Sequence, residues 1–147
     1  MGLSTLPCLC RAYNHLERRG LAGKISLIIG GGLFTPGDFL KCLALGADAV
    51  IIGTIAALAM SNVQVNKTTP WEPPTELLLY DGSKKEEYDE DQGAINLSNF
   101  FHSCVREMTI LARALGKKDL QELNREDLVA LDRQYAGFTG VQYWGGN

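Results

Sequence analysis

The stretch that decides the fold is "ISLIIGGGLFTPGDFLKCLALGADAVIIGT", residues 25–54. It begins and ends with short apolar runs, ISLII and ADAVIIG, which are typical of strands buried on both faces. Between them, Thr35 can cap a helix, Pro36 suits its first position, and Asp38 stands three residues after the cap. We therefore expect a strand–helix–strand unit with parallel strands and a right-handed connection.

Glycines close both apolar runs. Three of them follow the first run, whereas Gly53 ends the second and Thr54 begins a short apolar helix. A helix start carries free N–H groups and a positive dipole end, and glycine lets the backbone approach an anion closely. In (β/α)8 barrels a phosphate site commonly follows strands seven and eight, beside a short extra helix. The residues alone leave two interpretations: a phosphate-binding corner formed by Gly31, Gly32, Gly53 and Thr54, or purely structural turns.

The chain divides into three stretches by composition. Residues 1–61 contain an amphipathic helix, expected over 4–20, followed along the chain by the strand–helix–strand unit. Residues 62–95 form a connecting arm, first rich in proline and then charged, and its run SKKEEYDEDQ is expected to be a solvated loop. Residues 96–147 form a helical C-terminal extension.

The extension contains the longest expected helix, from Asn96 to Leu115, with apolar residues at helical spacing and Gly116 after it. The spacing of Asn124 and Asp127 is that of a cap pair, which predicts a further short helix at that point.

Composition excludes several classes of function. The 147 residues carry a net charge of −3, which gives no electrostatic argument for binding nucleic acid or an anionic membrane. Residues 43–60 approach the length of a membrane span, but Asp48 and two glycines interrupt them. The start of the chain lacks a basic region ahead of an apolar core, so we expect no secretory signal. Four cysteines without a pairing pattern favour a reduced, cytoplasmic protein.

No metal or nucleophile pattern stands out. Cys8 and Cys10 are two positions apart, as are His102 and Cys104, and residues at that spacing do not share a helix face. We therefore expect no metal site and no Cys–His catalytic pair.

A family resemblance extends over nearly the whole chain. The string IIGGGLFTPGDFLKCLALGADAVIIGT resembles the closing strands of the FMN-binding domain of glutamate synthases and of smaller FMN-binding glutamate synthase-like proteins. LPCLCRAYNHLERRGLAGKISL is similar to the helix that leads into those strands. PWEPPTELLLYDG and NFFHSCVREMTILARALGKKDLQELNREDLVAL resemble the C-terminal extension of the same proteins.

The resemblance implies an α/β fold: the C-terminal portion of a TIM (β/α)8 barrel, with about two parallel strands, followed by a helical extension. It also implies an FMN-dependent oxidoreductase that makes glutamate from 2-oxoglutarate and glutamine-derived ammonia. Carried onto this sequence, Gly31, Gly32, Gly53 and Thr54 would hold the FMN phosphate through backbone amides, and Thr54 would add its hydroxyl.

The sequence departs from the family pattern at two positions near the glycines. Gly30 stands where the family usually has serine, and Phe34 stands where many relatives have arginine. A side-chain contact and a cation are thereby missing. Residues 61–80 contain no cysteine, so we expect no iron–sulfur cluster.

Two strands cannot close a barrel, which needs about 250 residues. The strands expected to form the flavin-ring pocket and the 2-oxoglutarate site are not in this chain, so its catalytic residues are unknown. We expect a complementary chain carrying the remaining strands, or self-association. The alternative is a non-catalytic α/β interaction module or remnant that docks a partner chain. A third option is a different phosphate-binding barrel. The resemblance of PWEPPTELLLYDG to the C-terminal extension of glutamate synthases argues against it.

Overall fold

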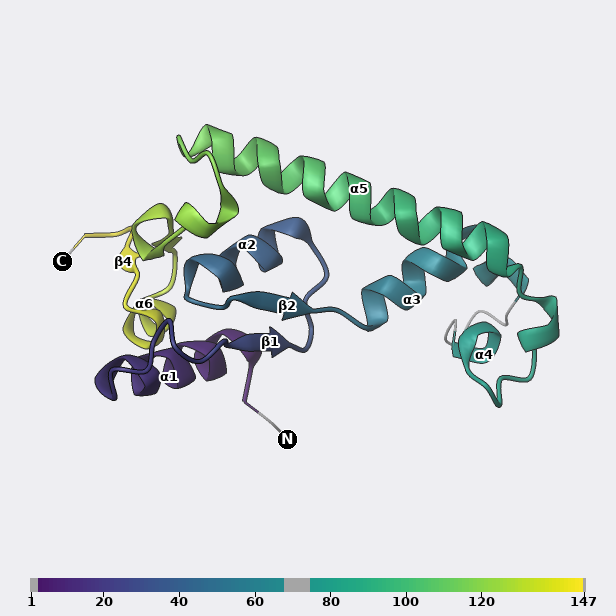
Figure 1. Ribbon diagram of the computed structural model, residues 1–147, viewed down its shortest axis with the longest axis horizontal. Helices are drawn as coiled ribbons and strands as arrows, with labels where there is room; N and C mark the ends of the chain where they lie inside the picture. Colours follow the sequence, from purple (N-terminus) through teal and green to yellow (C-terminus); the bar gives the residue numbers. More distant parts are fainter. Residues whose placement is uncertain (1–2, 68–74, 147) are drawn as a thin grey trace. The chain divides into compact units, whose positions relative to one another are not determined.

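The computed structural model describes residues 3–67 and 75–146 (Figure 1). The chain forms two compact units, described separately below. One comprises the chain up to Ile51 together with Glu107 and the residues after it, and the other runs from Ile52 to Arg106.

The first unit contains the expected strand–helix–strand arrangement. Helix α1 (Thr5–Arg18) precedes strand β1 (Ile28–Gly30), helix α2 (Pro36–Ala44) and strand β2 (Ala49–Ile51). The two strands pair in parallel, residue for residue along their whole length. Helix α1 packs against β1 and α2 against β2 (Figure 1). The fold is α/β, and the predicted parallel pair with its connecting helix is confirmed.

Local signals account for the bounds of α2. The Thr35 side chain accepts a hydrogen bond from the Asp38 amide, and the Asp38 carboxylate accepts one from the Thr35 amide, with Pro36 at the first helical position. After the helix, Gly46 adopts a φ of +103°, a conformation that residues other than glycine rarely adopt. The buried face of α2 consists of Phe39, Leu40, Cys42 and Ala44.

The strands are not buried, and the expectation of two fully covered strands is wrong. Ile28 is 55% exposed and Ile51 is 62% exposed. The physical reason is the size of the sheet: in the described part of the chain only β1 and β2 belong to it, so each has an unpaired edge and uncovered apolar side chains. An apolar run shows that a strand can be buried. It does not show that other elements cover the strand.

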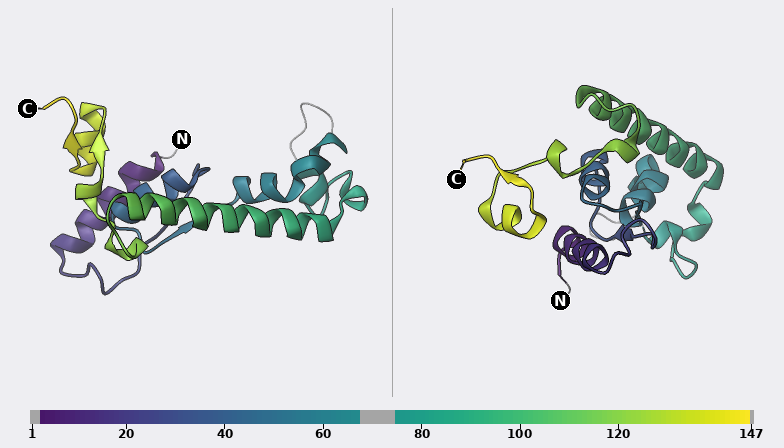
Figure 2. Two further views of the ribbon diagram at one scale, coloured as in Figure 1. Left: turned by 90° about the horizontal axis from the view of Figure 1, so that it is seen from above. Right: turned by 60° about the vertical axis from the view of Figure 1, so that its left-hand side comes forward.

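The C-terminal part of the first unit folds back onto α1. Two short 3-10 helices come first, and the second of them starts with the predicted cap pair, because Asn124 and Asp127 form a reciprocal capping box. Two short strands then pair in parallel, and the helix that lies between them in sequence packs against α1 (Figure 2). These elements are η3 (Leu120–Glu122), η4 (Arg125–Asp127), β3 (Val129–Ala130), α6 (Arg133–Thr139) and β4 (Gln142–Tyr143).

The second unit is helical in its described residues. Gln64 is buried there and ties the unit together, since its side-chain amide donates to the Asp89 carbonyl at 3.0 Å and accepts from the Asp89 amide at 2.7 Å. Its elements are α3 (Thr54–Ser61), η1 (Asn62–Lys67), α4 (Thr75–Leu78), η2 (Lys85–Glu87) and the first part of α5 (Glu90–Ala114). The proline-rich part of the arm, 68–74, lies outside the described residues.

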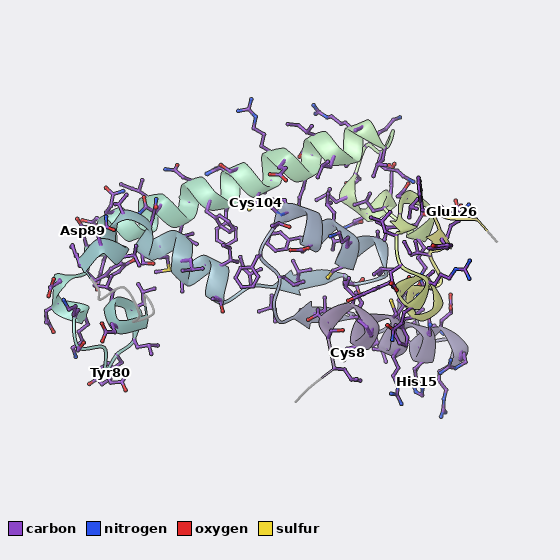
Figure 3. All side chains as sticks on the ribbon, turned by 180° about the vertical axis from the view of Figure 1, so that it is seen from behind. Cys8, His15, Tyr80, Asp89, Cys104 and Glu126 are labelled. Carbon is purple, nitrogen blue, oxygen red and sulfur yellow. The ribbon has the colours of Figure 1, made fainter. Side chains whose placement is uncertain are left out.

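Helix α5 begins six residues before the expected Asn96, so the charged run is not simply a loop. The Asp89 side chain, at the N-terminal end of α5, accepts a hydrogen bond from the Gln92 amide at 2.9 Å (Figure 3). Glu90 and Asp91 occupy the first turn, where negative charge complements the helix dipole. The acidic residues therefore start the helix. Among the described residues, no helix is both long and apolar enough to cross a membrane.

Candidate functional site

The turn after β1 carries the first pair of predicted site residues. Gly31 has a φ of +115° and Gly32 a φ of +64°, and both are exposed. A Cβ on Gly31 would also lie 3.3 Å from the Thr5 hydroxyl oxygen, whereas nothing stands within 4 Å of the corresponding position on Gly32. Both residues thus use the backbone freedom of glycine, and Gly31 additionally uses its lack of a side chain.

Gly30, which departs from the family serine, sits at the strand pairing itself. A Cβ there would lie 3.0 Å from the Ile51 carbonyl oxygen and 3.2 Å from the Ile51 Cβ. A side chain at this position would require the neighbouring strand to shift by a few tenths of an ångström. The departure from serine therefore fits the close approach of β1 and β2.

Backbone amides in this turn are left without partners. Within residues 3–67 and 75–146, the N–H groups of Gly32 and Leu33 donate to no acceptor. The next two amides, those of Phe34 and Thr35, donate to the Asp38 carboxylate at 3.4 and 3.1 Å. The start of α2 is therefore satisfied by its own capping residue, and the free donors lie in the glycine turn before it.

The charge on Asp38 is stabilised by this capping arrangement. Partial burial raises the pKa of Asp38, but hydrogen bonds from the Thr35 side chain and from the Thr35 and Phe34 amides outweigh it, so the pKa lies below its ordinary value. Lys41 lies 3.3 Å from the same carboxylate. Lys41 lines the same cavity as Gly31 and Gly32, and it already has an acidic neighbour in Asp38.

The Thr5 hydroxyl, at the first residue of α1, donates a hydrogen bond to the Gly31 carbonyl oxygen. A cavity of about 330 Å³ opens beside this contact, and its walls include Gly31, Gly32, Lys41 and Tyr135. Sequence reasoning missed Thr5 in this role, because the contact joins residues 26 positions apart and no local motif signals it.

The second pair of predicted residues lies at the start of α3, in the second unit. Gly53 is the residue before the helix, no side chain caps the helix, and its first turn contains no acidic residue. The first backbone bond runs from the Ala57 amide to the Gly53 carbonyl at 3.0 Å. The amides of Thr54, Ile55 and Ala56 have no acceptor in the described parts of the chain. Unlike α2, helix α3 thus begins with its donors and its positive dipole end unsatisfied.

The structure places the four predicted residues as two adjacent pairs, Gly31 with Gly32 and Gly53 with Thr54, in different units. Along the chain, Gly31 and Gly32 directly follow β1, whereas Gly53 and Thr54 come two residues after the end of β2. Each pair offers uncompensated N–H donors that suit an anion. Among the described residues no group of three or more His, Cys, Asp or Glu side chains is arranged to hold a metal ion.

The buried cysteines have no place in this chemistry. Cys10 and Cys42 are fully buried, and burial, together with the nearby Asp38 and Cys10, raises the pKa of Cys42 to about 11. Neutral, inaccessible thiols pack as small hydrophobic groups. Cys8 lies on α1 with His15, on a more accessible part of the helix (Figure 3).

The parallel strand–helix–strand unit of β1, α2 and β2 defines the class as an α/β protein. The chain belongs to the glutamate synthase family: residues 1–118 match the family model described as the conserved region in glutamate synthase.

Relatives agree with this family. The chain is similar to a glutamate synthase large subunit-like protein of Rhizobium meliloti (strain 1021), at 32% identity over 96% of this chain and 36% of the relative. It is also similar to an archaeal glutamate synthase [NADPH] of Methanocaldococcus jannaschii, at 28% identity over 97% of this chain and 29% of the relative. The chain thus spans about a third of the length of these relatives. No solved structure gave a significant match.

Proposed function

We propose that this chain is the C-terminal part of an FMN-dependent, (β/α)8-barrel glutamate synthase-like oxidoreductase, with β1 and β2 as its last two barrel strands. Family membership and the parallel β1–α2–β2 unit support the proposal. The observation that carries it is the set of N–H groups without acceptors after β1 and at the start of α3. In such barrels a phosphate site is frequently formed by the loops after the last two strands and the N-terminus of a short extra helix.

The proposed ligand of these amides is the phosphate of FMN. A phosphate monoester carries about −1.5 to −2 charges near neutral pH and three strong acceptor oxygens. Gly31 and Gly32 would bind it through the turn after β1, and Gly53 and Thr54 through the start of α3, where the exposed Thr54 hydroxyl adds a donor. When bound, FMN would supply the electron transfer of the reaction, and Gly31, Gly32, Gly53 and Thr54 would hold its phosphate end.

The proposal includes a partner. Ile28 and Ile51 are more than half exposed on strands whose outer edges are unpaired in the described residues. A complementary chain that carries the remaining barrel strands would pair with these edges and cover both side chains. Self-association is the other way to satisfy them.

A second candidate function rests on the same exposed side chains. A non-catalytic α/β interaction module would use the apolar surface around Ile28 and Ile51 to dock a partner and would need no flavin. Phe34 in the place of a cation favours this candidate, because an exposed aromatic suits a docking surface better than a phosphate site.

The two functions differ in how the full chain responds to FMN and to riboflavin, which lacks the phosphate. We expect FMN, but not riboflavin, to shift the ¹⁵N–¹H signals of Gly32, Leu33 and the first amides of α3, with inorganic phosphate acting weakly at the same signals. Equal effects of FMN and riboflavin, or none, would refute phosphate binding and leave the interaction module. Tight FMN binding with strong quenching of flavin fluorescence by the chain alone would contradict the incomplete barrel.

A charge variant separates binding from folding. Thr54→Glu places a carboxylate beside the free amides of α3, which stabilises the helix by about 0.3–1 kcal/mol while repelling phosphate. We expect FMN affinity to fall at least tenfold without loss of thermal stability. Asn99→Glu, which adds the same charge at an exposed position within α5, serves as the matched control and should leave FMN binding unchanged.

A further inference from the structure

We infer that Thr5 is a positioning residue for the phosphate-binding turn: its hydroxyl holds the Gly31 carbonyl, and this contact aims the Gly32 N–H group at the anion. The inference rests on the proposed function, and it assigns to α1 a role in a site whose predicted members all follow β1 or β2.

The geometry of the peptide bond carries the argument. The described chain contains no cis peptide bond, so the Gly31 carbonyl and the Gly32 N–H group point in opposite directions from one planar unit. The carbonyl faces α1, because it accepts the hydrogen bond from the Thr5 hydroxyl. The Gly32 N–H group therefore points away from α1, and it has no acceptor among the described residues.

The turn needs such an anchor because it consists of glycines. Gly31 and Gly32 both have positive φ, and neither has a side chain that would hold the peptide between them in one orientation. A rotation of this peptide plane would exchange the positions of the N–H donor and the carbonyl acceptor, presenting partial negative charge to a phosphate. The hydrogen bond from Thr5 favours the orientation that presents the donor.

Thr5 is suited to this task by its own position. It opens α1, so its backbone is fixed by the helix, and its branched side chain has few rotamers. The neighbouring Ser4 makes no side-chain hydrogen bond to the helix it precedes. Thr5 makes the hydrogen bond to the Gly31 carbonyl, and within the described part of the chain no such bond is made by Ser4. Ser4 therefore provides a matched control.

The experiment compares Thr5→Val, Thr5→Ser and Ser4→Ala in the full chain. Valine keeps the shape of threonine without the hydroxyl, and serine keeps the hydroxyl. In the absence of ligand, we expect Thr5→Val to change the chemical shift of the Gly32 amide. Affinity for FMN and for inorganic phosphate should fall about fivefold to tenfold, the loss expected for one hydrogen bond. Thr5→Ser and Ser4→Ala should stay within about twofold of wild type.

The outcomes separate this inference from the proposed function. If wild type binds FMN through its phosphate and Thr5→Val binds it equally well, Thr5 only fastens α1 to the turn, and the positioning role is overturned while the proposed function stands. If wild type shows no phosphate-dependent binding, both fall. A Gly32 amide that is unchanged in Thr5→Val also overturns the inference, whatever the affinities.

Discussion

Replacing Gly46 by alanine tests the packing that joins α2 to α1. Gly46 follows α2 with a φ of +103°, and an added Cβ would lie 2.2 Å from the Cδ2 atom and 2.4 Å from the Cε2 atom of Tyr13. The Tyr13 ring cannot retreat freely, because the Arg125 guanidinium lies 5.1 Å from its centroid and also donates to Asn14 at 2.9 Å. The substitution therefore strains the backbone and displaces a held ring.

Two contributions set the expected loss of stability. The backbone contribution for a non-glycine residue in the left-handed region is about 1–2 kcal/mol. Displacing Tyr13 loses packing and a cation–π contact, which together contribute about 1–2 kcal/mol more. We expect the free energy of unfolding to fall by about 2–4 kcal/mol, and the melting temperature by roughly 5–15 °C for a chain of this size.

Urea unfolding followed by circular dichroism measures the loss, and two further variants divide it. Gly116→Ala is the matched control, since Gly116 has a φ of +75° but nothing within 4 Å of the added Cβ. It should show the backbone contribution alone. The double variant Gly46→Ala with Tyr13→Ala should be more stable than the sum of its single losses predicts. Equal losses for Gly46→Ala and Gly116→Ala, or strict additivity in the double variant, would refute the steric argument.

Three further predictions concern caps, acid and thiols. Thr35→Ala removes the acceptor for the Asp38 amide and should lower stability by about 1 kcal/mol in urea unfolding, whereas Thr35→Ser should retain most of it. Asp38 and Asp127 both have pKa values lowered in the folded chain, so they stabilise it fully above their unfolded pKa of about 4 and lose that contribution as pH falls through the lower folded values. Urea midpoints between pH 5 and pH 2 should record this, and the change should be smaller in Asp38→Asn or Asp127→Asn. Iodoacetamide at pH 8, followed by mass spectrometry, should modify Cys8 first and leave buried Cys42, with its pKa of about 11, intact until urea is added; early modification of Cys42 would contradict the packing.

The parts of the fold that could be predicted from sequence are those fixed by neighbours along the chain. Thr35 with Asp38, and Asn124 with Asp127, form capping boxes as their spacing predicted, because these bonds need only three consecutive peptide units. The glycine turn could also be predicted, since positive φ strongly favours glycine and depends little on distant residues.

The features that escaped prediction depend on distant residues or on a competing local effect. Burial of β1 and β2 depends on what else covers the sheet, which the apolar pattern cannot state. The contact of Thr5 with Gly31 joins separate elements. The early start of α5 at Glu90 was missed because acidic residues suit both a solvated loop and a first helical turn, and Asp89 decides for the helix.

The exposed isoleucines of the two-stranded sheet have a practical consequence for producing the protein. Ile28 and Ile51 stand beside free strand edges, which are templates for adding another copy of the same chain. Chain produced in excess of the proposed complementary chain should bind hydrophobic dyes, precipitate at modest sulfate concentrations and be degraded by quality-control proteases. Its yield should therefore depend on stoichiometry during synthesis more than on the melting temperature of the purified protein.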